Sequence, residues 1–190
     1  MEPDFYARSS LEVARDLLGC VLVREHAEEG CSSGRIVETE AYTGLDDPAS
    51  HAAARIGRTK RNDPLFGPPG TAYVHLNYGI HWCLNAVAGP DGVPAGVLIR
   101  ALEPVDGRQL MRNRRGGREE LTNGPGRLTQ ALAVGPEFQR HRLDAPPLRI
   151  IAGSPVPEQA IGRSPRVGIS RAVDLPYRFT DDRSSWLTKP

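Results

Sequence analysis

The stretch RIVETEAYTGLDDPASH, residues 35–51, begins as a β-strand and ends as a polar loop. Residues 35–41 alternate as in a half-buried strand, so that one face carries Val37, Thr39 and Ala41. The other face carries Glu38, Glu40 and Tyr42. Carboxylates two positions apart on a strand have Cα atoms roughly 6–7 Å apart and point the same way. This face therefore gathers acidic and aromatic side chains in one line.

Paired carboxylates are typical of glycosidic-bond cleavage, in which one group is ionised and a neighbour can keep the other protonated. In a second reading, one of the pair only forms a salt bridge with an arginine. A third interpretation is a metal site, but the sequence contains no C-x-x-C or H-E-x-x-H pattern that would support it. Walker, dinucleotide-binding and G-x-S-x-G motifs are also missing from the sequence. The metal reading would use Glu40, Asp46, Asp47 and His51, or His75, His81 and Cys83.

Length and composition predict one globular domain spanning residues 1–190. The chain is 39% hydrophobic and contains 20 Gly and 17 Pro, which fits a loop-rich soluble protein. No run of eighteen apolar residues predicts a membrane span, and the N-terminus does not resemble a secretion signal. Three cysteines, an odd number, suit free thiols in a reducing compartment. We therefore expect a cytoplasmic protein, associated with the nucleoid if bacterial.

Positive charge is concentrated in two clusters that contain no acidic residue. Such clusters can follow a phosphate backbone, although charge runs are more often a solvated face. The clusters permit nucleic-acid binding without proving it. They consist of Arg55, Arg58, Lys60 and Arg61, and of Arg108, Arg112, Arg114, Arg115 and Arg118.

The order of the expected elements predicts a mixed α+β domain. Ser9 and Glu12 form a capping box that opens a helix ending before Gly19. Further helices are expected near 107–115 and 127–134, and loops over 145–165 and the last ten residues. Strands come in adjacent pairs, which favours a curved, mostly antiparallel sheet with surrounding helices. They are expected at 20–25, 34–41, 71–76, 79–88, 96–102, 148–152 and 166–170.

Two of these strands are joined by Asn77-Tyr78-Gly79, which predicts a protruding β-hairpin with Tyr78 near its tip. A large exposed aromatic is costly unless it meets a partner. Proteins that distort DNA insert side chains between base steps from such positions. The alternative is a tyrosine that folds back onto its own strand.

Taken together, VETEAY, YVHLNYG, LIRALEP, NGPGRLTQALAV and RVGIS resemble the alkyladenine (3-methyladenine) DNA glycosylase family. The matches run in order over roughly residues 9–186, nearly the whole chain, which implies a single glycosylase domain with its core over that span. The resemblance implies a curved antiparallel sheet, no metal or other cofactor, and a monomer acting on double-stranded DNA. It implies a monofunctional glycosylase of base excision repair, which flips and excises damaged purines. The lesion class comprises 3-methyladenine, 7-methylguanine, hypoxanthine and ethenoadenine.

Carried over residue by residue, the resemblance makes Glu40 the general base that activates water, and leaves Glu38 a structural role. Arg100 and the backbone carbonyl of Val167 would help to hold that water, and Tyr78 would replace the flipped nucleotide. The extruded base would lie among Tyr42, His51, His75 and Asn85, with Asn85 where a purine 2-amino group must pass. The DNA backbone would be held by Arg58, Lys60, Arg61, Arg112 and Arg115.

Two points qualify this expectation. Some family members carry a tyrosine where this chain has His75, and an imidazole offers less stacking area and can be charged or neutral. Strand cleavage would need an amine nucleophile, and the only lysines are Lys60 and Lys189. We therefore expect no lyase activity. A non-catalytic lesion-binding protein and a metal-dependent nuclease stay open as alternatives.

Overall fold

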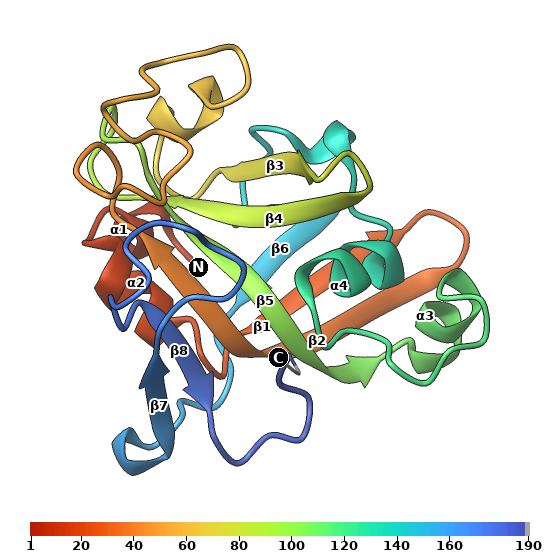
Figure 1. Ribbon diagram of the computed structural model, residues 1–190. Coiled ribbons are helices and arrows are strands. Elements are labelled where there is room, and N and C mark those ends of the chain that lie inside the picture. Colours follow the sequence, from red (N-terminus) through yellow and green to blue (C-terminus); the bar gives the residue numbers. More distant parts are fainter. Residues whose placement is uncertain (189–190) are drawn as a thin grey trace.

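The computed structural model describes residues 1–188, and two long antiparallel strands form the middle of its sheet (Figure 1). These strands are β2 (Gly30–Tyr42), which contains the paired glutamates, and β5 (Ala95–Asp106). The sheet has eight strands in the order β3-β4-β5-β2-β1-β6, and β8 joins it beside β2 and pairs with β7. The other strands are β1 (Val21–His26), β3 (Ala72–Asn77), β4 (His81–Ala88), β6 (Leu148–Ile151), β7 (Ile161–Ser164) and β8 (Arg178–Asp181).

The pairing of β2 is irregular in its middle, and two different strands, β1 and β8, pair with it along the same edge. β1 pairs with Gly30–Arg35, and β8 pairs with Glu38–Glu40. The register against β5 shifts on both sides of Glu38, and such bulges bend a strand and increase its twist. The sheet is therefore strongly curled. The shift also places Ile36, rather than the expected Val37, in the main core cluster together with Ala41.

The predicted N-terminal helix is confirmed as α2 (Ser10–Asp16), preceded by the short α1 (Pro3–Tyr6). Its capping box is formed as expected: Ser9 Oγ accepts from the Glu12 N–H, and the Glu12 carboxylate accepts from the Ser9 N–H. α2 packs on β2, where the Thr39 hydroxyl donates to a helix carbonyl at 2.7 Å. The helix thus covers the face of β2 that does not carry the paired glutamates.

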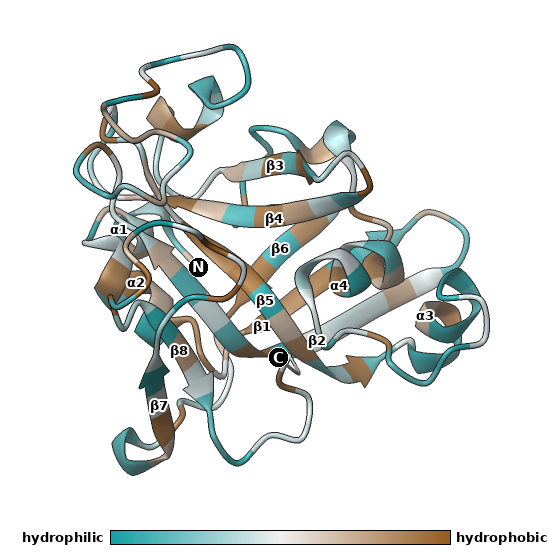
Figure 2. Cartoon of the chain, viewed as in Figure 1, coloured by the Kyte–Doolittle hydropathy of each residue, from teal (hydrophilic) through white to brown (hydrophobic). Residues whose placement is uncertain are grey.

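Two further helices cover the far end of the sheet. α3 (Arg108–Arg114) packs on α4 (Pro125–Leu132), and α4 packs on β4 and β5. Apolar residues concentrate in these strands and in α2, whereas the loops around them are mostly hydrophilic (Figure 2). Short 3₁₀ turns lie at Asp63–Phe66, Pro136–Phe138 and Glu158–Ala160.

The predicted fold class, a single mixed α+β domain with a curved antiparallel sheet, is confirmed. The strand expected at 166–170 is wrong, because these residues form an irregular segment between β7 and β8. β7 and β8 themselves were not predicted, and β7 lies in the proline-rich region expected to be a loop. β3 and β4 pair as expected, and protrusion of their hairpin stays a prediction. Within residues 1–188, no helix is both long enough and apolar enough to cross a membrane.

Candidate active site

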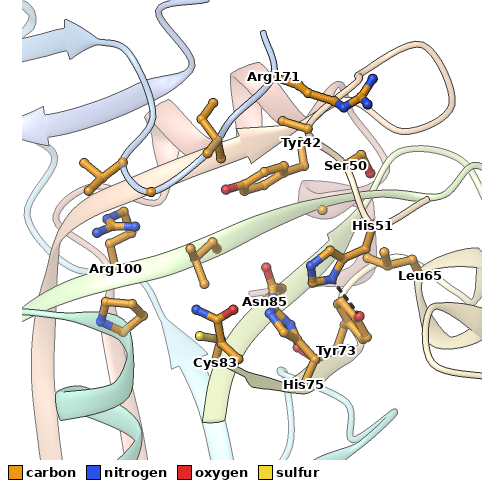
Figure 3. A pocket seen from close by; sticks show the side chains of 18 of the residues that line it. Tyr42, Ser50, His51, Leu65, Tyr73, His75, Cys83, Asn85, Arg100 and Arg171 are labelled. Carbon is orange, nitrogen blue, oxygen red and sulfur yellow. Dashed lines mark hydrogen bonds between the residues drawn. The ribbon is translucent and has the colours of Figure 1, made fainter. Parts of the chain in front are cut away.

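A cavity of about 280 Å³ opens where β2 ends and β3, β4 and β5 run side by side (Figure 3). Its lining comes from the loop after β2, from these three strands and from the irregular segment before β8. Tyr42 lies on one side, and His51, His75 and Asn85 lie across from it. Sequence-predicted site residues that line this single cavity are Tyr42, His51, His75, Tyr78, Asn85, Arg100 and Val167.

Glu40 lies directly behind this lining, with no exposed surface. One carboxylate oxygen accepts from the Val167 N–H at 2.7 Å and lies 3.3 Å from Arg100 Nη1. The other oxygen accepts from the Tyr42 hydroxyl at 2.9 Å. All three partners line the cavity although Glu40 itself does not. These contacts therefore fix the orientation of the carboxylate, and the residues that bind it separate it from the cavity.

Glu38 has different surroundings and is also fully buried. Its carboxylate accepts from Arg178 Nε at 2.7 Å, from Arg100 Nε at 3.1 Å and from the Thr188 N–H at 2.6 Å. It does not line the cavity. Arg100 thus bridges the two glutamates; it is the one cavity-lining residue among these partners of Glu38, whereas Glu40 is held by three lining residues.

Opposite Tyr42, three rings form a cluster defined by His51, His75 and Tyr73. The His75 and Tyr73 rings are stacked with centroids 5.0 Å apart, and the His51 ring meets His75 edge-on at 4.5 Å. His51 Nδ1 is 3.0 Å from the Tyr73 hydroxyl. Tyr73 was not singled out from the sequence, although its place two residues before His75 on one strand was a usable signal.

The cluster is uncharged near neutral pH. Burial lowers the pKa of His75 to about 3, with further lowering from the neighbouring His51 and Arg61. Burial, together with Arg61, also lowers the pKa of His51. Neutral rings can stack on a planar base without repelling a positive charge on it. Burial therefore favours the neutral form of the imidazole at position 75.

These lowered pKa values predict a loss of stability in acid. A histidine whose pKa is lower in the folded state than its ordinary 6.5 binds its proton mainly in the unfolded chain. Its stabilising contribution is present above about pH 6.5 and is lost as the pH falls toward about 3. We expect the urea midpoint of the wild type to fall between about pH 7.5 and pH 5, and His75→Phe to fall less. His81→Gln, at an exposed histidine, should match the wild type; equal acid sensitivity of His75→Phe would contradict the prediction.

Asn85 is buried on β4 and lines the cavity beside this cluster. Its Nδ2 donates to the Tyr73 carbonyl at 3.1 Å and lies 3.2 Å from His75 Nδ1. The side chain therefore bonds the neighbouring strand and faces the cavity at the same time. Its position is fixed by groups on β3.

Tyr78 occupies the turn between β3 and β4 at the cavity mouth. Its side chain does not fold back, since 79% of the residue is exposed. Its backbone has φ 50°, a left-handed conformation that costs roughly 1–2 kcal/mol for residues other than glycine. Ile80, at the end of the same turn, is 71% exposed. The turn thus exposes two large side chains, of which Tyr78 lines the cavity and Ile80 does not.

Comparison with known proteins places this geometry in a family. The family model for methylpurine-DNA glycosylase matches residues 4–185. The chain belongs to this family. It is accordingly a DNA glycosylase, a hydrolase of N-glycosyl bonds, and the resemblance seen in its motifs is confirmed.

Curated relatives agree along nearly the full length of the chain. A protein of Carboxydothermus hydrogenoformans is 48% identical over 188 residues, covering 97% of this chain and 96% of its own. One from Rhodopseudomonas palustris (strain BisB18) is 47% identical, covering 100% and 91%. One from Methanoculleus marisnigri is 48% identical, covering 97% and 96%. Each of the three bears the name "Putative 3-methyladenine DNA glycosylase".

The basic residues expected to hold DNA are placed unequally in this glycosylase. Arg58 is exposed but paired with Asp63 at 2.6 Å, and Arg61 donates to the Leu76 carbonyl near the hairpin turn. Arg112 pairs with Glu119 at the exposed end of α3. Only 6% of Arg115 is exposed, and its expected contact with the DNA backbone stays a prediction. Its guanidinium joins α3 to α4 through Gln130 and the Glu120 carbonyl.

Sequence reasoning also missed two groups beside the glycosylase cavity. Arg171 lines it from the irregular segment before β8. Arg166, in the same segment, forms a fully buried ion pair with Asp47. Although burial works against the charged form, hydrogen bonds from this guanidinium to Asp47 raise the pKa of Arg166. Asp47 was weighed only as a metal ligand, because the sequence gives no signal that pairs it with an arginine more than a hundred residues away.

Proposed function

We propose that this protein flips damaged purines out of duplex DNA into the cavity and hydrolyses their N-glycosidic bond, leaving an abasic site. The observation that carries the proposal is the buried Glu40 carboxylate, held by Val167, Tyr42 and Arg100 directly behind a cavity lined by aromatic rings. Extruding a base costs a few kcal/mol, least for damaged pairs. Tyr78 at the mouth would take the place of the extruded nucleotide.

In the proposed complex, the base stacks between Tyr42 and the cluster of His51, His75 and Tyr73. Alkylation makes the base a better leaving group, and the neutral rings accept its positive charge through their π-faces. Glu40 takes a proton from water as that water attacks the anomeric carbon of the sugar. The water would lie between Arg100 and Val167, with the Val167 carbonyl as a second acceptor. The Val167 N–H meanwhile holds the carboxylate in place.

The test is release of free base from duplexes that each carry one lesion: 3-methyladenine, 7-methylguanine, hypoxanthine or ethenoadenine. Release with EDTA present is expected, since no residue in the proposed mechanism uses a metal. Tight lesion binding without release would instead indicate a non-catalytic binding protein. Strand breaks that EDTA abolishes would indicate a metal-dependent nuclease.

We expect the product to be an intact strand with an abasic site. Cutting the strand by Schiff-base chemistry needs an amine at the anomeric carbon. Lys60 belongs to the first basic cluster, and Lys189 lies outside the described residues. The terminal amino group of Met1 is bonded to the Ile150 carbonyl on β6, at the opposite end of the sheet order from β3. Strand scission before alkali or heat, measured on a denaturing gel, would contradict this prediction.

Asn85 is proposed to reject normal guanine. Adenine-derived lesions lack the 2-amino group of guanine, and stacking alone favours every purine, so rejection needs a repulsive element. Asn85→Ser should raise excision of undamaged guanine, most visibly from mispairs, relative to hypoxanthine. Because Asn85 donates to the Tyr73 carbonyl, we expect a stability cost of about 1 kcal/mol. An unchanged guanine-to-hypoxanthine rate ratio in the folded variant would show that Asn85 only bonds β3.

A further inference from the structure

A single buried ion pair connects the segments that form the candidate active site. The guanidinium of Arg166 and the carboxylate of Asp47 contact each other twice, at 2.5 and 2.9 Å, and neither side chain has any exposed surface. Removing two charges from water is expensive, and apolar replacements of such pairs are often as stable. Stability alone therefore does not explain why this pair is present.

The Asp47 side of the pair fixes the loop between β2 and His51. Its carboxylate accepts from the Thr43 N–H at 3.2 Å and from the Ala49 N–H at 3.0 Å. Thr43 and Ala49 both belong to the short connection between Tyr42 and His51. These two ring residues lie on opposite sides of the cavity. The Asp47 carboxylate thus holds the conformation of the loop that joins the Tyr42 and His51 rings.

The Arg166 side fixes the end of β2 and the residue that holds Glu40. Its Nη1 donates to the Ala41 carbonyl at 2.9 Å, and its guanidinium lies 4.6 Å from the centre of the Tyr42 ring. The next residue along the chain is Val167, whose N–H donates to Glu40. Residues 165–177 contain no helix or strand, so this side chain is a main anchor of the segment.

We propose that Arg166 and Asp47 are positioning residues, which hold Tyr42, Val167 and the Glu40 carboxylate in the geometry needed for base release. This inference rests on the function proposed above. The pair touches neither base nor water and acts through the residues that do. Misplacing a catalytic group by about 1 Å can cost ~10²-fold in rate, so a weakened pair should lower the rate constant and not only the amount of folded enzyme.

The experiment is single-turnover release of hypoxanthine from a duplex under enzyme excess, with Asp47→Asn and Arg166→Lys. At saturating enzyme the single-turnover rate constant reports the geometry of the site, and a thermal melt of each variant reports separately how much of it is folded. We expect the rate constant to fall ~10-fold or more in both variants. Lysine keeps the charge but lacks the planar two-point contact, so it should not rescue the rate. Asp181→Asn is the matched control: it also removes a fully buried carboxylate paired with an arginine, at 2.7 Å, but away from the cavity lining.

Asp181→Asn should lower thermal stability while it leaves the rate constant near that of the wild type. In the Glu40→Gln background, Asp47→Asn should lower the rate less than threefold further, because both changes act through one carboxylate. Wild-type rate constants in both pair variants would overturn the proposal, as would additive losses with Glu40→Gln. Failure of both variants to fold would overturn it too, by showing a folding role. If the wild type itself releases no base, the proposed function fails instead.

Discussion

Glu40→Gln is expected to lower base release by at least ~10²-fold while lesion-duplex binding persists. The amide keeps the shape of the side chain and can still accept from the Val167 N–H, but it cannot take a proton from water. Single-turnover release and a gel-shift titration on the same duplex measure the two quantities separately. Loss of both together would indicate a collapsed site and not a missing base.

Glu38→Gln is the matched control, because it removes the same charge two residues away on the same strand. Glu38 is surrounded by Arg178, Arg100 and the Thr188 N–H and lies outside the cavity lining. We expect it to cost stability and to reduce activity less than Glu40→Gln. Retained excision in Glu40→Gln with complete loss in Glu38→Gln would assign the catalytic role to Glu38.

Tyr78→Ser is expected to lower excision from duplex DNA by ~10-fold or more, because unstacking a base step costs a few kcal/mol that the inserted ring offsets. The loss should be much smaller for the same lesion in single-stranded DNA, where no base pair has to open. Ile80→Ser, at the other exposed apolar residue of the turn, controls for a general loss of apolar surface. An unchanged duplex rate in Tyr78→Ser would remove the insertion role.

Much of the fold could be predicted from local patterns. The Ser9–Glu12 capping box depends on neighbours three residues apart, and the alternation along β2 depends on residues two apart. β7 and β8 could not be predicted in this way. Each is four residues long, and each gains its stability from long-range pairing, β8 with Glu38–Glu40 of β2. The strand expected at 166–170 is wrong for a similar reason: the Val167 N–H binds the distant Glu40 carboxylate, a contact that no local pattern reveals.

In the candidate site, too, local patterns could be predicted and long-range contacts could not. Residues carried by motifs converge on one cavity, including Tyr42, Asn85 and Arg100. The Arg166–Asp47 pair was not foreseen, because no local pattern links positions so far apart in the chain. Charge in a sequence does not reveal burial, so it could not show that the long side chain of Arg115 turns inward between two helices.

The shared edge of β2 has a consequence for how the enzyme is made. β8 and the Arg166–Val167 segment belong to the last quarter of the chain, whereas the cavity's aromatic rings and Tyr78 are all encoded in its first half. During synthesis, both glutamates and the aromatic rings therefore leave the ribosome before Glu40 can receive its backbone donor from Val167 and Glu38 its strand partner β8. The arrangement of the two buried carboxylates is completed only by the last quarter of the chain.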